Sequence, residues 1–160
     1  MDLVNKHREK GIIVDTNVLL AYFVGAYDSR LLPKFKRTNR YSVDDYILLA
    51  SLLRHFKQII TLPNVLTEIN SLSNQLPNLL KPNYYAEFKK QVETHHEQYV
   101  ECRIACDQVH FTRCGLTDSA IIRVAEKGIL VLTDDFPLAN RILEMGFDCI
   151  NFEHVRSLSL

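Results

Sequence analysis

The chain has 160 residues, 47% of them hydrophobic, and its formal net charge is zero because 19 basic residues balance 19 acidic ones. This length and hydrophobicity predict one globular domain over 1–160 with a buried core, and they exclude a disordered chain. The charge balance excludes a strongly basic nucleic-acid-binding protein, although a local basic patch remains compatible with it.

The sequence also carries no segment typical of export or membrane insertion. No apolar run reaches the length of a membrane span, and the first residues, MDLVNKHREKG, lack the apolar centre of a signal peptide. Four cysteines in a chain of this size do not suggest a disulfide framework. We therefore expect a cytoplasmic protein with reduced thiols and no membrane partner.

Short apolar runs alternate along the chain with segments of helical periodicity. The predicted elements are a strand at 11–14, a helix up to 23, an insertion around 25–45, a helix capped by Ser42, a strand at 58–62, a helix starting at Pro63, a linker at 77–83, a long helix around 84–109, a helix at 116–127, a strand at 129–133, a helix at 136–146 and an edge strand at 148–152. Thr16 or Asn17, and later Thr117, are predicted helix caps. This order predicts an α/β fold, a three-layer α/β/α sandwich with a short, mostly parallel sheet of four or five strands.

Acidic residues follow the predicted strands or begin the helices next to them. Asp15 ends the first strand, Asp134 and Asp135 follow the third, and Glu68 lies about one and a half turns into the helix after the second. Asp118 lies at the start of the helix that precedes the third strand. Because ligands of open α/β sheets bind beyond the carboxyl ends of the strands, we expect these carboxylates to converge there.

Converging carboxylates repel one another, and a divalent cation with oxygen ligands offsets the repulsion. Mg²⁺ or Mn²⁺ fits best, because no His or Cys cluster accompanies the acids. Such a cation activates a water molecule and holds a phosphate oxygen, and a second ion stabilises the leaving oxygen, so the acids predict phosphodiester hydrolysis. On this interpretation a cation, and not a protein partner, stabilises the charge of Asp15. The alternative, for Asp118 or Asp135 alone, is a helix-dipole role worth about 0.3–1 kcal/mol.

Four segments together resemble the PIN-domain family of metal-dependent ribonucleases, which includes toxin-like proteins. They are IIVDTNVLL (12–20), LPNVLTEI (62–69), GLTDSAIIRVAEK (115–127) and ILVLTDDFPLANRILEMGF (129–147), in the family's order. The resemblance assigns the catalytic, metal-binding acids to Asp15, Glu68, Asp118 and Asp135, with Asp134 as a substitute or helper. It assigns the polar positions that orient these acids to Thr16, Asn17 and Thr133.

The resemblance implies an endoribonuclease that cleaves single-stranded RNA with two Mg²⁺ or Mn²⁺ ions and leaves a 5′-phosphate. Many small members are toxins of toxin–antitoxin pairs, so an antitoxin protein and a second copy of the chain are candidate partners, besides single-stranded or structured RNA. Two alternatives stay open: a non-catalytic RNA-binding or scaffold module, and a flap-endonuclease-like DNA nuclease. The insertion around 25–45 and the long helix around 84–109 depart from the most compact toxins.

A basic segment, KFKRTNRY at 34–41, is a candidate RNA-binding surface. It contains the cations Lys34, Lys36, Arg37 and Arg40, interleaved with the aromatic residues Phe35 and Tyr41. Cations neutralise phosphates, and exposed aromatic faces stack on bases. The alternative is a solvated loop that is merely basic.

Histidines and cysteines also cluster between 95 and 114, but their spacing matches no standard zinc pattern. Cys102 and Cys106 fall on the apolar stripe of the predicted long helix, so we expect them to be buried. We expect Cys149 to be a core residue for the same reason.

Overall fold

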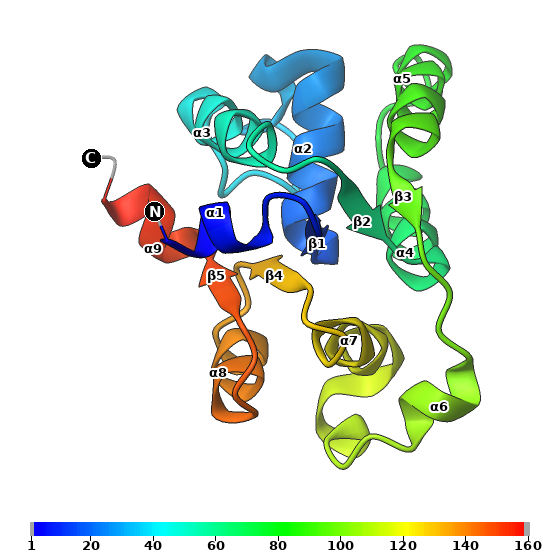
Figure 1. The fold of residues 1–160 in the computed structure, drawn as a ribbon. Coiled ribbons are helices and arrows are strands. Elements are labelled where there is room, and N and C mark those ends of the chain that lie inside the picture. The colour runs from blue at the N-terminus through cyan, green and yellow to red at the C-terminus, as the bar shows by residue number, and fades with distance from the viewer. Residues whose placement is uncertain (1, 159–160) are drawn as a thin grey trace.

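The structure, a computed structural model, describes residues 2–158. In this range a single parallel sheet lies between two layers of helices, which confirms the predicted α/β/α sandwich (Figure 1). The sheet contains, in spatial order, β3 (His96–Glu97), β2 (Ile59–Thr61), β1 (Ile12–Val14), β4 (Leu130–Thr133) and β5 (Cys149–Asn151).

The helices divide between the two faces of the sheet. One face carries α2 (Thr16–Asp28), α3 (Val43–Leu53) and α5 (Lys81–Thr94), and the other carries α7 (Phe111–Ala125) and α8 (Phe136–Glu144) (Figure 1). The remaining helical elements are α1 (Asp2–His7), the 3-10 turn η1 (Ser29–Leu31), α4 (Pro63–Ser73), α6 (Cys102–Cys106) and α9 (Phe152–Ser157). Within residues 2–158, no helix is long and apolar enough to cross a membrane.

Strand β1 forms the centre of the sheet because its side chains are apolar on both faces. Ile12, Ile13 and Val14 are fully buried, and β1 pairs in parallel with β2 on one side and β4 on the other. A continuous apolar run is expected for a parallel strand covered by helices on both faces.

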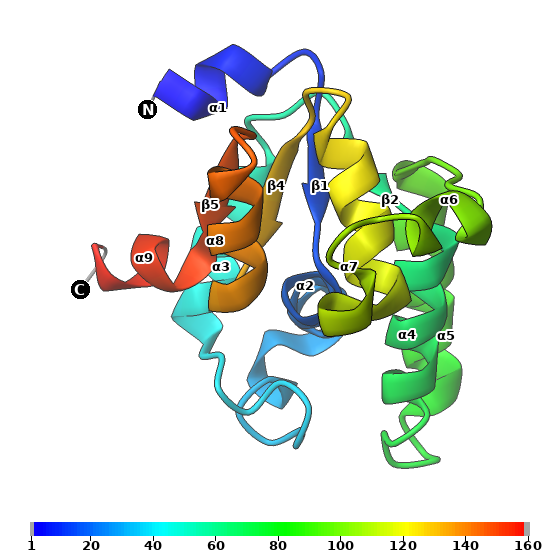
Figure 2. The ribbon, with the colours of Figure 1, turned by 90° about the horizontal axis from the view of Figure 1, so that it is seen from below.

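After β1 the chain adds β2 and then β3 on one side of the central strand. It then returns to the other side of β1, where it adds β4 and then β5. The carboxyl ends of the neighbours β1 and β4 therefore form the switch point at which open α/β sheets bind ligands. Figure 2 shows α2 starting directly beyond the carboxyl end of β1, whereas α1 lies near the opposite end of the strands.

Two predicted helix starts are confirmed. Ser42 caps α3 in a reciprocal arrangement with Asp45: the Asp45 backbone N–H donates to the Ser42 hydroxyl at 3.1 Å, and the Ser42 N–H donates to the Asp45 carboxylate at 2.7 Å. Pro63 is the first residue of α4, where its missing N–H costs no hydrogen bond.

The predicted long helix over 84–109 is wrong. Helix α5 ends at Thr94, the edge strand β3 follows, and α6 forms only after a further extended segment. Long-range contacts are made at the break: the ring of His95 stacks on Phe23 of α2 with a centroid distance of 5.5 Å, and β3 pairs with β2. Since the predicted helix does not form, Cys102 and Cys106 are exposed, contrary to expectation, whereas Cys149 is buried as predicted.

The predicted insertion around 25–45 is partly helical and contributes to the core. Helix α2 continues to Asp28, and η1 follows directly. Phe35 and Tyr41 are only 6% and 2% exposed. The idea that these two rings stack on bases is therefore wrong, because the core covers their faces.

Helix α7 contains a break at the position where the sequence predicts its start. Gly115 has φ +76° and ψ −172°, a backbone conformation that glycine adopts at little cost. A first helical segment begins already at Phe111, and the predicted helix from Leu116 onward forms the second segment.

Candidate metal centre

The switch point brings together acidic side chains from four parts of the chain. Asp15 follows β1, Asp135 follows β4, Glu68 lies in the second turn of α4, and Asp118 lies in α7 after the break. The charges of the other three acids each raise the pKa of Asp118, and those of Asp135 and Glu68 also raise the pKa of Asp15. These four carboxylates, called the acidic group below, are close enough to repel one another.

Asp15 is held by protein partners as well as being part of the acidic group. It is 5% exposed; its Oδ1 accepts a hydrogen bond from the backbone N–H of Thr16 at 2.6 Å, and its Oδ2 accepts one from the Thr133 hydroxyl at 2.7 Å. The expectation that it lacks a protein partner is therefore wrong. Asp15 is also the N-cap of α2, in place of the predicted Thr16 or Asn17. Burial raises its pKa most, and the two hydrogen bonds act against that rise.

Thr133 connects the two acids that follow the central strands. Its hydroxyl donates to Asp15 and accepts from the backbone N–H of Asp135 at 3.0 Å. The Asp135 carboxylate in turn accepts from the N–H of Leu138 at 2.8 Å and caps α8. Asp135 therefore caps α8 and also belongs to the acidic group, so the two roles are not alternatives.

Replacing Thr133 with valine is expected to lower the free energy of unfolding by about 1–3 kcal/mol, because valine keeps the shape but removes the hydroxyl that bonds to the buried Asp15 carboxylate and to the part-buried Asp135 N–H. Urea denaturation measures this loss. Thr133→Ser, which retains the hydroxyl, is the matched control and should recover most of the stability. An unchanged stability in Thr133→Val, or a loss in Thr133→Ser as large as in Thr133→Val, would contradict a dominant role for the hydroxyl.

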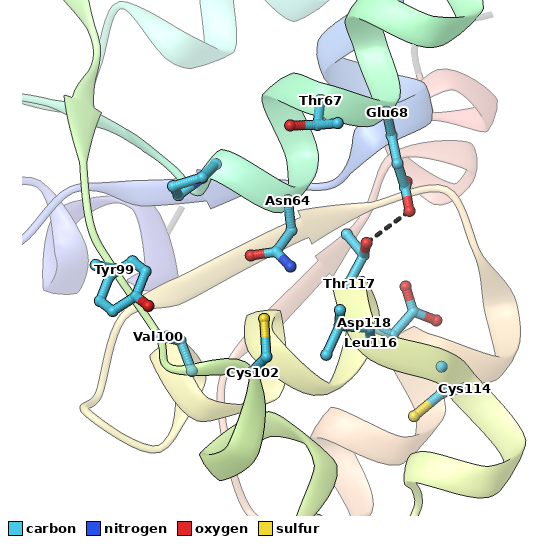
Figure 3. Close-up of a pocket in the computed structure, with 12 residues that line it drawn as sticks. Asn64, Thr67, Glu68, Tyr99, Val100, Cys102, Cys114, Leu116, Thr117 and Asp118 are labelled. Carbon is cyan, nitrogen blue, oxygen red and sulfur yellow. Dashed lines mark hydrogen bonds between the residues drawn. The ribbon is translucent and has the colours of Figure 1, made fainter.

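Glu68 is held by two threonines. The Thr16 hydroxyl donates to one carboxylate oxygen at 2.8 Å. The Thr117 hydroxyl donates to the other at 2.5 Å, the bond that is dashed in Figure 3. The contact from Thr117 was not predicted, since the sequence suggested only a helix cap. A signal was present, because Asp15, Glu68 and Asp118 are each next to a threonine in the sequence and Asp135 is two positions after Thr133. Asn17, by contrast, is exposed and makes no hydrogen bond to any of the four acids.

Asp118 has a strongly raised pKa, and the pKa of Asp15 is also raised. Burial and the charges of Asp15, Asp135 and Glu68 raise its pKa to about 7, against a partly compensating effect of Arg141. Its side chain makes no hydrogen bond within residues 2–158. Arg141, on α8, is a cation near the site that the sequence analysis did not identify.

The stability of the metal-free protein should depend on pH through Asp118. Because its folded pKa of about 7 exceeds the ordinary value of 3.8, the folded state binds more protons than the unfolded state between these values, and stability falls as pH rises through this window. In EDTA, Asp118→Asn should therefore raise the Tm relative to wild type at pH 8 and have little effect near pH 4. Thermal unfolding over this pH range measures the difference. A difference independent of pH would contradict the raised pKa.

Asp134 faces away from the acidic group. Its side chain is fully buried and forms an ion pair with Arg40 and a hydrogen bond with the Tyr41 hydroxyl. Its charge is not among the main causes of the raised pKa of Asp15 or of Asp118. Of the two adjacent acids, the structure therefore places Asp135 with the group, and the expected helper role of Asp134 as a ligand has no support.

The four cations of the basic segment are all exposed but differ in their partners. Arg40 pairs with Asp134, and Arg37 donates to the side-chain oxygen of Gln75 at 2.8 Å. Lys34 and Lys36 make no ion pair or side-chain hydrogen bond within residues 2–158. These two lysines are consequently the cations of the segment that remain available to a phosphate.

The donor chemistry of the acidic group fits a hard cation, because every ligand it offers is a carboxylate oxygen. As the side chains stand, however, no three His, Cys, Asp or Glu residues within 2–158 form a ready-made ligand set. A cation would therefore have to draw the mutually repelling carboxylates together. Asp118, which has no competing hydrogen bond, is the acid best able to move.

Comparison with known proteins gives no further guide to the site: no protein-family model matches the sequence, and no curated protein matches it.

Proposed function

We propose that this protein is a divalent-metal-dependent endoribonuclease of the PIN type, which cleaves single-stranded RNA by attack of water on the phosphodiester. The observation that supports the proposal most is the group of four carboxylates at the switch point between β1 and β4. Structural acids are usually paired with cations, whereas burial and the charges of the other three acids together raise the pKa of Asp118. An arrangement that costs stability in this way is typical of a functional site.

Asp15, Glu68, Asp118 and Asp135 would hold the Mg²⁺ or Mn²⁺ ions. Such ions, when bound, supply an activated water and neutralise charge on the phosphate. Hydrogen bonds from Thr16, Thr117 and Thr133 fix the orientation of Glu68 and Asp15. Asp118 has no such bond and can accept a hydrogen bond from the attacking water. Water would add to phosphorus as the bond to the 3′ oxygen breaks, leaving a 5′-phosphate and a 3′-hydroxyl.

A role as the toxin of a toxin–antitoxin pair, an antitoxin partner, a homodimer and a cytoplasmic location belong to the same proposal. The toxin, antitoxin and homodimer roles rest on the family resemblance of the four sequence segments, and the cytoplasmic location rests on the cysteine content of the sequence.

The test uses 5′-labelled single-stranded RNA and DNA of one sequence, incubated with purified protein in Mg²⁺, Mn²⁺, Ca²⁺ or EDTA. We expect RNA cleavage in Mg²⁺ or Mn²⁺, little in Ca²⁺, which binds carboxylates at longer and looser distances, and none in EDTA. The products should carry 5′-phosphates. Cleavage that persists in EDTA would indicate a contaminating ribonuclease and contradict the proposal. Preferred cleavage of DNA would favour the flap-endonuclease-like alternative, and RNA binding without cleavage would favour the non-catalytic module.

A further inference from the structure

A pocket of about 520 Å³ lies directly beside the acidic group, between the start of α4, the extended segment before α6 and the break in α7. Glu68, Thr117 and Asp118 belong both to its lining and to the region of the acidic group. A nucleotide whose phosphate lies at the carboxylates could therefore reach this pocket with its base. The volume falls within the range of about 300–1,000 Å³ that is usual for small-ligand pockets.

The walls of the pocket combine apolar surface with polar groups, which include the Asn64 amide and the thiols of Cys102 and Cys114 besides the carboxylates and threonines already described. Val100 and Leu116 supply apolar lining, and Tyr99 stands at the margin with 72% of its surface exposed. Figure 3 shows the Asn64 amide projecting into the space between Tyr99 and the Glu68–Asp118 side of the pocket. This amide makes no hydrogen bond within residues 2–158. An unstacked nucleobase can stack on an exposed aromatic ring and form hydrogen bonds with an unpaired donor and acceptor near it.

We propose that this pocket binds the nucleobase next to the scissile phosphate, with Tyr99 stacking on the base and Asn64 hydrogen-bonding to its edge. The inference rests on the proposed nuclease function and adds the residues that select the RNA. The base edge is read by one donor and one acceptor on the same side chain, and such paired contacts discriminate between bases. Tyr99 would stack on any base and so would contribute affinity, whereas Asn64 would contribute base preference.

The test measures binding of labelled A, U, C and G homopolymers of about 12 nucleotides, by fluorescence anisotropy in Ca²⁺ to suppress cleavage. Tyr99→Ala should weaken binding about 5- to 50-fold for every homopolymer, and Tyr99→Phe, which keeps the ring, should remain within about twofold of wild type. Asn64→Ala should weaken the preferred homopolymer about 5- to 50-fold and reduce the ratio between the strongest and weakest ligands. Asn140→Ala, at an exposed site on α8, is the matched control and should change nothing.

An oligomer with abasic riboses in place of nucleosides separates stacking from other effects of the substitution. It should bind wild type and Tyr99→Ala equally, because there is no base to stack. Unchanged homopolymer affinity in both Tyr99→Ala and Asn64→Ala would overturn the inference, as would an equal loss in Tyr99→Phe. Because Tyr99 is largely exposed, thermal unfolding of its variants should match wild type.

The outcomes for the pocket and for the proposed function are distinguishable. Metal-dependent cleavage together with unchanged affinities in the variants would retain the nuclease and overturn the base pocket. Loss of affinity in the variants without any cleavage by wild type would retain the pocket and overturn the nuclease.

Discussion

Asp118→Asn is expected to lower metal-dependent RNA cleavage by at least about 100-fold while the protein stays folded. Loss even of groups that merely support metal ligands typically costs 10- to 100-fold, and Asp118 would be a ligand itself. The fold should persist because asparagine has the same shape and removes one charge from a group in which Asp15, Asp135 and Glu68 already repel it.

Single-turnover cleavage at saturating Mn²⁺ measures the effect, with circular dichroism as the check on folding. Asp44→Asn, which changes an exposed acid in the first turn of α3, is the matched control and should keep the wild-type rate. A wild-type rate in Asp118→Asn would remove this residue from the active site and leave the proposed metal centre without one of its four ligands.

Arg40→Ala is expected to lower the free energy of unfolding by about 3 kcal/mol, the cost of leaving a buried charge without its partner. Asp134 is fully buried, and without Arg40 it would retain only the Tyr41 hydroxyl. Its second carboxylate oxygen, Oδ1, has no hydrogen-bond partner within residues 2–158. Urea denaturation measures the loss.

Two further variants show whether the buried charge is the cause. Arg30→Ala breaks an exposed ion pair with Asp28 and should cost less than about 1 kcal/mol. Adding Asp134→Asn to Arg40→Ala should recover part of the stability, since the unpaired charge is then absent. Similar losses in Arg40→Ala and Arg30→Ala would show that the ion pair with Asp134 contributes little.

The pair between Arg40 and Asp134 also changes how RNA binding by the basic segment should be tested. Replacing all four cations together would destabilise the protein and confuse a binding defect with unfolding. Lys34 and Lys36 can be replaced without breaking an ion pair or a side-chain hydrogen bond within residues 2–158.

The sequence by itself determined the fold class and the positions of the four acids along the chain. Apolar runs such as Ile12–Val14 identify buried parallel strands, and Ser42 and Pro63 mark helix starts, because these signals are local and act through hydrogen bonds or burial within a few residues. Parallel pairing then places residues that follow different strands at one edge, so Asp15 and Asp135 come together whatever the details of the loops.

Only the tertiary structure decided which of Asp134 and Asp135 joins the acidic group. Successive side chains at a strand end point to opposite sides, and the sequence does not show which side Asp15 occupies. Asp134 turns toward Arg40 and Tyr41, which lie more than ninety residues earlier in the chain. The end of α5 at Thr94 was likewise not predicted: the next residues contact Phe23 and pair with β2, both distant in sequence, and helical periodicity carries no information about such contacts. Local patterns therefore determined where elements form, and long-range packing determined where they end and which side chains they present.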